Sequence, residues 1–219
     1  MKLENNKLNE ELTEEDKGRS PIVYILALFM ILLLILWIVP HYKIKIDPEP
    51  KNIPSKEDIL PEKIDFVERN STIFARSQFI ELIDPNDPLI KQTASKVASQ
   101  SCDSGKVCQA KAIFYFVRDN FNYVSDPETE YIESAREVLA TGGADCDGIA
   151  VLLANLQEAI GVETRFVFIP GHVYVQIKLE DALKKYKTQD DWINLDPTCS
   201  YCEFGEIPYQ NIESRKTYV

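Results

Sequence analysis

The stretch Thr141-Gly-Gly-Ala-Asp-Cys-Asp-Gly-Ile-Ala-Val-Leu-Leu-Ala-Asn-Leu-Gln-Glu-Ala-Ile-Gly161 decides the fold that the sequence predicts. Its second half repeats apolar residues at helical spacing, and Gly161 is a natural C-terminal stop. Asp145 is a good N-cap, so Cys146 falls in the first turn, where free N–H groups and the helix dipole favour a thiolate. The carboxylates of Asp145 and Asp147 oppose that charge. Cys146 therefore needs a cationic partner if it is to act as a nucleophile.

His172 is the histidine best placed to be that partner. The chain has two histidines, and His41 lies far upstream beside an apolar run. His172 opens the alternating stretch that follows the predicted cysteine helix, and Asp196 ends the next apolar stretch. A thiolate–imidazolium pair held by a carboxylate is what cysteine-based acyl transfer requires. The candidate catalytic residues are therefore Cys146, His172 and Asp196.

Three motifs around these residues resemble the transglutaminase-like superfamily, which shares the arrangement of papain-like cysteine peptidases. They are Cys146-x-x-x-Ala150 with Leu-Leu-Ala154 and Gly161, then Gly171-His172-Val-Tyr-Val175, then Trp192-x-x-Leu-Asp196-Pro-Thr198. The resemblance covers residues 87–208 and implies a nucleophilic Cys146, a general base His172 and an orienting Asp196. It also implies that the segment holding Asn122 and Tyr123 approaches the catalytic cleft. Tyr174 departs from the pattern, because family members often carry tryptophan at this position. The difference bears on the shape expected for the acyl-acceptor cleft.

The order of the predicted elements indicates an α+β domain of transglutaminase-like or papain-like fold. Helices come first, expected over 89–100, 106–120 and 132–140, and they precede the cysteine helix. Strands follow in succession, expected over 162–169, 173–179 and 192–195. Such an order favours helices packed on an antiparallel sheet.

The sequence before this domain divides into three parts. Residues 1–20 form a polar, acidic tail, typical of a solvated segment. Residues 21–40 contain the unbroken apolar run Ile22 to Val39, which at about 1.5 Å per residue reaches roughly 27 Å, enough to cross a bilayer. A removed signal sequence is the alternative. Residues 41–61 are rich in proline and charge, which predicts an extended stalk before a catalytic domain over 62–219.

The cysteines and one sequon bear on which side of the membrane the domain occupies. Cys102, Cys108, Cys199 and Cys202 form two close pairs, for which disulfides are favoured over a four-cysteine zinc site. Disulfides and the glycosylation-type sequence at Asn70 both favour an extracytoplasmic domain on a single-pass membrane protein. Free thiols or a thiol–disulfide activity of Cys199 and Cys202 remain as alternatives.

The predicted function is a membrane-tethered cysteine acyl-transfer enzyme that acts on protein or peptide amides, either as a peptidase or amidase or by crosslinking amines. The alternative is a non-enzymatic module of the same fold that binds partners at the cell surface. A net charge of −11 argues against nucleic acid as a partner. We expect no cofactor and no catalytic metal, since the sequence carries no calcium-loop pattern.

Overall fold

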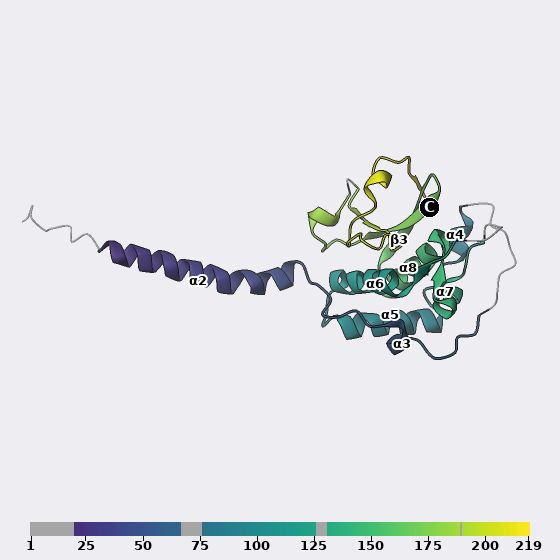
Figure 1. The fold of residues 1–219 in the computed structure, drawn as a ribbon, viewed down its shortest axis with the longest axis horizontal. Helices are drawn as coiled ribbons and strands as arrows, with labels where there is room; N and C mark the ends of the chain where they lie inside the picture. Colours follow the sequence, from purple (N-terminus) through teal and green to yellow (C-terminus); the bar gives the residue numbers. More distant parts are fainter. Residues whose placement is uncertain (1–19, 67–75, 126–130, 189) are drawn as a thin grey trace, which may run out of the picture. The chain divides into compact units, whose positions relative to one another are not determined.

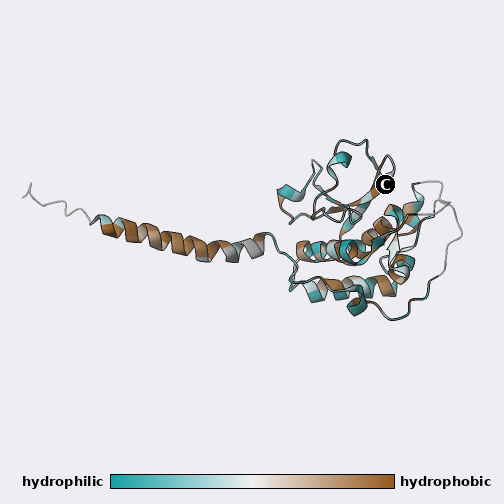
Figure 2. Cartoon of the chain, viewed as in Figure 1, coloured by the Kyte–Doolittle hydropathy of each residue, from teal (hydrophilic) through white to brown (hydrophobic). Residues whose placement is uncertain are grey.

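The computed structural model describes residues 20–66, 76–125, 131–188 and 190–219. The chain forms two compact units, Met1–Lys43 and Ile44–Val219. Most of the helix α2 (Pro21–Ile46) lies in the first unit, and most of its length is hydrophobic (Figure 2). The large apolar side chains from Ile22 to Leu36 are exposed. Pro21–Val39 is long and apolar enough to cross a membrane, and a signal sequence would have the same properties. The predicted helix is confirmed, while its role stays a prediction.

Helices make up the first part of the second unit. The helix expected over 89–100 is confirmed and begins at Pro88, because the N-cap carboxylate of Asp87 accepts the N–H groups of Leu89 and Ile90. The helices in chain order are α3 (Lys56–Ile59), α4 (Gln78–Glu81), α5 (Pro88–Ser101), α6 (Lys106–Asn120), α7 (Ala135–Thr141) and α8 (Cys146–Ala159). The cysteine helix α8 is central, since it is buried from Gly148 to Gln157 and packs against α5, α6, α7 and the sheet (Figure 1).

Strands make up the second part, and the predicted antiparallel sheet is confirmed. Its four strands are β3 (Glu163–Ile169), β4 (His172–Lys178), β5 (Trp192–Leu195) and β6 (Thr217–Tyr218). They lie in the order β5-β4-β3-β6 with every neighbouring pair antiparallel. Two short strands, β1 (Asn122–Tyr123) and β2 (Gly143–Ala144), pair in parallel beside the entry to α8. The 3-10 turns η1 (Lys184–Tyr186) and η2 (Tyr209–Asn211) complete the elements.

The main sheet has two covered faces, and strand alternation separates them. Val173, Val175 and Ile177 of β4 belong to the main core that includes the apolar side of α8. Tyr174, on the opposite face, packs in a small separate cluster with Val167, Ile169 and Ile207. His172 and Gln176 share the face of Tyr174, so the candidate base points away from the main core.

Residues 41–61 were expected to form an extended stalk. From Asp47 onward, this segment is instead packed on the domain. Lys111 of α6 is fully buried and binds the carboxylates of Asp47 and Glu49 at 2.5 and 2.6 Å. Further along, the Lys51 N–H donates to the Ser101 carbonyl. A buried ammonium requires carboxylate partners, and this segment supplies them. The second unit accordingly begins at Ile44, ahead of the expected boundary at residue 62.

Both close cysteine pairs form disulfides, Cys102–Cys108 between α5 and α6 and Cys199–Cys202 after β5. In this form the four sulfurs offer no thiolate to a zinc ion. The predicted glycosylation sequence at Asn70 lies outside the described residues.

Candidate active site

The start of α8 holds Cys146 as predicted. α7 ends at Gly142 with φ 80°, a left-handed conformation that turns the chain into β2 and then α8. Asp145 is the N-cap, and its Oδ1 accepts the N–H groups of Asp147 at 2.8 Å and Gly148 at 3.3 Å. Cys146 is therefore the first helical residue, with its own N–H among the groups that a helix leaves unpaired at its start.

The Cys146 thiol is half-buried and surrounded by carboxylates. It donates to Oδ1 of Asp147 at 3.4 Å. Burial, followed by the nearby charge of Asp147, raises the pKa of Cys146 to about 12, although the N–H of Val173 donates to the sulfur and acts to lower it. At neutral pH the resting group is a neutral thiol, so a base must take its proton before it can attack.

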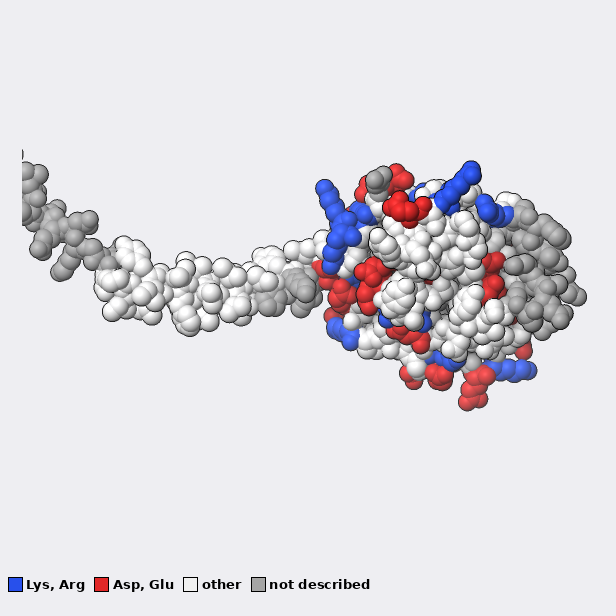
Figure 3. All heavy atoms as spheres, turned by 45° about the horizontal axis from the view of Figure 1, so that its top comes forward, with Lys and Arg blue, Asp and Glu red and all other residues white. Residues whose placement is uncertain are grey.

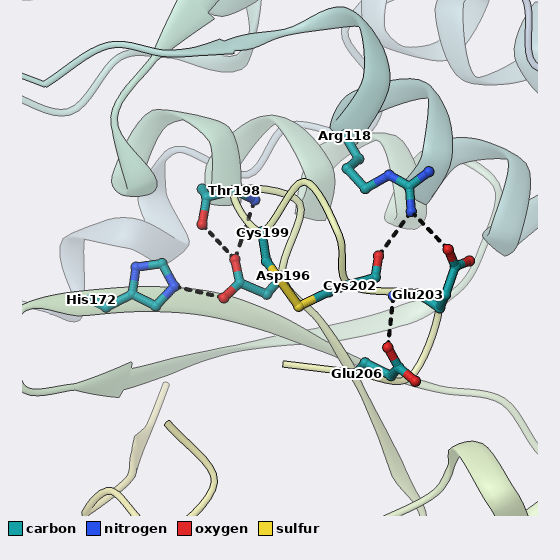
Figure 4. The surroundings of a disulfide bond; sticks show 8 residues. All are labelled: Arg118, His172, Asp196, Thr198, Cys199, Cys202, Glu203 and Glu206. Carbon is teal, nitrogen blue, oxygen red and sulfur yellow. Dashed lines mark hydrogen bonds and ion pairs between the residues drawn. A yellow bond between two sulfur atoms is a disulfide. The ribbon is translucent and has the colours of Figure 1, made fainter. Parts of the chain in front are cut away.

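The imidazole of His172 and the carboxylate of Asp196 form a direct pair. Nε2 of His172 lies 2.8 Å from Oδ2 of Asp196, which is fully buried (Figure 4). The register that pairs Val175 with Leu195 puts Asp196 across from Tyr174, and hence diagonal to His172 on one face of the sheet. A carboxylate at Nε2 keeps the proton of a neutral imidazole on that nitrogen, which leaves Nδ1 as the basic one.

The structure therefore pairs His172 directly with Asp196 and places the Cys146 sulfur beside Val173, the residue after His172, while the joint action of the three residues stays a prediction. Cys146 receives its N–H bond from Val173, the residue directly after His172. Asp196 reaches the imidazole from the end of β5. The arrangement can in principle move a proton from sulfur to imidazole while a buried carboxylate stabilises the resulting cation.

Thr198 is a residue of the candidate site that the sequence analysis did not predict. Oδ1 of Asp196 accepts both the Thr198 hydroxyl at 2.6 Å and the Thr198 N–H at 3.2 Å (Figure 4). These bonds leave Oδ2 for the imidazole and fix the plane of the carboxylate. The Asp-Pro-Thr sequence contained the signal, because aspartate often accepts the N–H two residues on.

Two further side chains lie beside the candidate residues, Tyr174, which the sequence analysis singled out, and Glu133, which it did not. Tyr174 is fully buried, and its ring is stacked on that of His172 with centroids 6.3 Å apart. Glu133 lies at the first turn of α8, where a Cβ on Gly148 would come within 2.5 Å of its carboxylate. Asn122 and Tyr123 form β1 beside Gly143 and Ala144 with exposed side chains, and a role for them in the cleft stays a prediction.

Among the residues that the structure describes, one trio offers ligand atoms close enough for a single metal ion. These are Asp145, Cys146 and Asp147, whose atoms lie within 4.8 Å of one another. The same carboxylates cap α8 and accept the thiol proton. The expectation of metal-independent catalysis stays a prediction.

The family model described as the transglutaminase-like superfamily matches residues 91–197, which include all three candidates. No curated protein matches the chain. Among solved structures, Legionella pneumophila LapG is similar at 17% identity with a TM-score of 0.43, over 75% of this chain and 80% of LapG. A protein provisionally described as a cysteine protease from Cytophaga hutchinsonii is similar at 17% identity and a TM-score of 0.40. That match covers 57% of this chain and only 43% of the other, and neither structure is close enough to transfer an activity.

Proposed function

Because the chain belongs to the transglutaminase-like superfamily through residues 91–197, we propose that it is a cysteine enzyme that transfers acyl groups from protein or peptide amides. Cys146 is the nucleophile, His172 the general base and Asp196 the group that orients the imidazole. The observation that carries the proposal is the 2.8 Å bond between His172 and the buried Asp196. His172 begins β4, and the N–H of the next residue, Val173, donates to the Cys146 sulfur.

The proposed reaction begins when Nδ1 of His172 accepts the proton of the Cys146 thiol. The sulfur attacks the amide carbonyl, and the N–H of Cys146 donates to the developing oxyanion, where the helix dipole favours negative charge. The imidazolium returns its proton to the leaving amine as the carbon–nitrogen bond breaks, which leaves a thioester on Cys146. Water or a second amine then takes the acyl group.

The raised pKa of Cys146 supports a base-assisted mechanism over a preformed ion pair. A thiol with a pKa of about 12 is a poor nucleophile until a base accepts its proton in the transition state. The same pKa also favours the second candidate, a non-enzymatic binding module in which Cys146 never ionises. The two candidates differ in what happens when His172 is removed.

We further propose that the apolar run Ile22–Val39 tethers the enzyme to a membrane, with the domain on the extracytoplasmic side. Two disulfides support that side, because they persist in oxidising compartments. Protease treatment of intact cells tests the orientation. Loss of the domain while a cytoplasmic marker survives supports it, and full protection contradicts it.

The first prediction tests the thiol through alkylation of the unreduced full-length chain. Cys146 is the free cysteine, so an iodoacetamide probe should label it and leave the disulfides unlabelled. Cys146→Ala should abolish labelling together with hydrolysis of an activated peptide ester. His172→Ala should keep the thiol but lower ester hydrolysis by about 100-fold or more, since general-base catalysis contributes about that factor. Undiminished hydrolysis in either variant would refute the proposed roles, and a wild-type chain without hydrolysis would favour the binding module.

A further inference from the structure

The loop after β5 carries the carboxylate that pairs with His172, and it is built from two consecutive turns. The first turn runs from Asp196 to Cys199, because the N–H of Cys199 donates to the Asp196 carbonyl at 3.3 Å. The second runs from Cys199 to Cys202, where the N–H of Cys202 donates to the Cys199 carbonyl at 3.1 Å. The two turns share Cys199, so a movement of this residue changes both.

The first turn follows from its sequence and directs the Asp196 side chain. Aspartate is favoured at the first position of a turn and proline at the second, which matches Asp196 and Pro197. Thr198, at the third position, donates both its hydroxyl and its N–H to Oδ1 of Asp196 (Figure 4). The direction of the carboxylate therefore depends on where the turn holds Thr198.

The second turn is held at its ends. Its middle residues, Ser200 and Tyr201, are exposed. Cys199 and Cys202, at the two ends, are buried and joined by the disulfide. Nη1 of Arg118, on α6, donates to the Cys202 carbonyl at 2.8 Å (Figure 4). The disulfide thus connects a point that is bound to α6 with the end of the first turn.

Both ends of the whole loop are anchored in the core. Leu195, the last residue of β5, is fully buried. Phe204, after the second turn, is also buried, and its ring centroid lies 6.2 Å from that of Phe114 and 5.3 Å from that of Tyr186. Residues 196–203 between these anchors form turns and irregular backbone. The disulfide is therefore the covalent link that restricts the path of the loop.

A disulfide that encloses so few residues acts mainly on local geometry. Its cysteines are three positions apart, whereas those of Cys102–Cys108 are six apart. The entropic stabilisation that a cross-link gives to the folded state increases with the number of residues it encloses. Local geometry matters beside Asp196, because a displacement of about 1 Å in a catalytic arrangement can lower the rate by about 100-fold.

We propose that the disulfide of this loop is a positioning element of the active site. Through Thr198, it holds the Asp196 carboxylate in the direction that binds Nε2 of His172. The inference rests on the proposed function and extends the set of residues on which the general base depends. A chain without this disulfide keeps its fold and its nucleophile, but its imidazole loses a fixed hydrogen-bond partner.

Proton NMR of the full-length chain in detergent, with 15N-labelled histidine, reads this hydrogen bond directly. A ring N–H in contact with water exchanges too fast to give a signal, whereas one bound to a buried carboxylate is protected. The wild type should show such a signal, and its loss in His172→Ala assigns it. The double variant Cys199→Ala, Cys202→Ala should weaken or remove the signal.

The matched control is Cys102→Ala, Cys108→Ala, which removes the other buried disulfide. That disulfide joins the end of α5 to the start of α6, and neither helix carries a candidate catalytic residue. The control should lower the urea unfolding midpoint at least as much as the loop variant does, yet leave the ring N–H signal unchanged. No protected signal in the wild type, an unchanged signal in the folded loop variant, or an equal loss in the control overturns the proposal.

The link through Thr198 is tested separately. Thr198→Val removes the hydroxyl at nearly constant volume and should weaken the ring N–H signal. Thr198→Ser restores a hydroxyl and should keep the signal. This pair decides the case if the loop variant fails to fold, because an unchanged signal in Thr198→Val overturns the proposal.

Acylation of Cys146 by an uncharged activated peptide ester measures the catalytic consequence. The loop variant should lose about tenfold in kcat with KM unchanged, and the control should match the wild type. The face of the domain that Figure 3 turns forward carries acidic groups around a broad uncharged area. Neither disulfide variant alters these charges, so they affect every rate equally. If the wild type forms no thioester while the ring N–H signal depends on the loop, the positioning inference stands and the proposed function fails.

Discussion

At the scale of single residues, burial and then the carboxylate of Asp147 raise the pKa of the Cys146 thiol. This carboxylate accepts the Cys146 proton at 3.4 Å. A thiol held neutral in this way reacts slowly with alkylating and oxidising agents, because these act on the thiolate. In the proposed mechanism, the proton leaves only when a base and a substrate carbonyl are both in place.

Asp147→Asn should therefore lower the thiol pKa and speed alkylation by iodoacetamide at pH 7.5 by roughly three- to tenfold. Asp103→Asn, which removes an exposed carboxylate on a different loop, is the control and should leave the rate unchanged. An unchanged or slower rate in Asp147→Asn would show that another group sets the thiol pKa.

At the scale of elements, the first turn of α8 is seated so closely that it requires glycine at position 148. A Cβ there would lie 2.5 Å from the Glu133 carboxylate and 2.7 Å from the Cβ of Ala144, which is fixed to the backbone of β2. The position of the candidate nucleophile thus depends on a contact between α8 and the loop before it.

Gly148→Ala should destabilise the domain by about 1–3 kcal/mol through overpacking. The sign of the change in unfolding free energy is diagnostic, because glycine to alanine in an unobstructed helix stabilises the protein by about 0.5–1 kcal/mol. Urea unfolding of the full-length chain in detergent measures it. A higher unfolding midpoint would mean that the turn has room for a methyl group.

Much of this element-scale picture could be predicted from the sequence. The helical spacing in the cysteine stretch and the alternation after His172 located α8 and β4, and the N-cap role of Asp145 followed from its side chain. Tyr174 was assigned to the sheet, but its stacking on His172 depends on a cluster with Ile207, more than thirty residues away in sequence. Long-range contacts of this kind leave no periodic signal.

At the scale of the whole domain, the buried ion pair of Lys111 fixes the segment that follows α2. The composition of that segment, rich in proline and charge, indicated a solvated stalk, and only the tertiary structure reveals its partner. One signal was available, because Lys111 lies on the apolar stripe of α6 between Val107 and Phe114. A lysine at such a position requires a carboxylate from elsewhere in the chain.

Lys111→Met should destabilise the domain by about 1–3 kcal/mol, since it removes the fully buried cation that binds Asp47 and Glu49 and leaves Asp47 with Lys185 and Tyr186. Lys51→Met is the matched control, because Lys51 binds Asp103 at 2.6 Å with both side chains mostly exposed. That exposed pair should contribute at most about 1 kcal/mol. Equal effects of the two variants in urea unfolding would contradict the structural role of the buried pair.

The same pair predicts how stability depends on pH. Burial acts to raise the pKa of Asp47, but hydrogen bonds from Lys111, Lys185 and Tyr186 outweigh it and lower the pKa from 3.8 to about 2. The stabilisation is complete above about pH 4 and is lost as the pH falls toward about 2. Asp47→Asn should therefore be less stable than the wild type at pH 7, and the difference should shrink as the pH approaches 2.

The most direct test of the central claim is to trap the thioester on Cys146 by rapid mixing with an activated peptide ester and mass spectrometry. We predict an acyl adduct on the Cys146 peptide that forms and decays in the wild type. The adduct should form at least about 100-fold more slowly in His172→Ala. An adduct on another residue, or one that forms on Cys146 equally fast without the imidazole, would contradict the account.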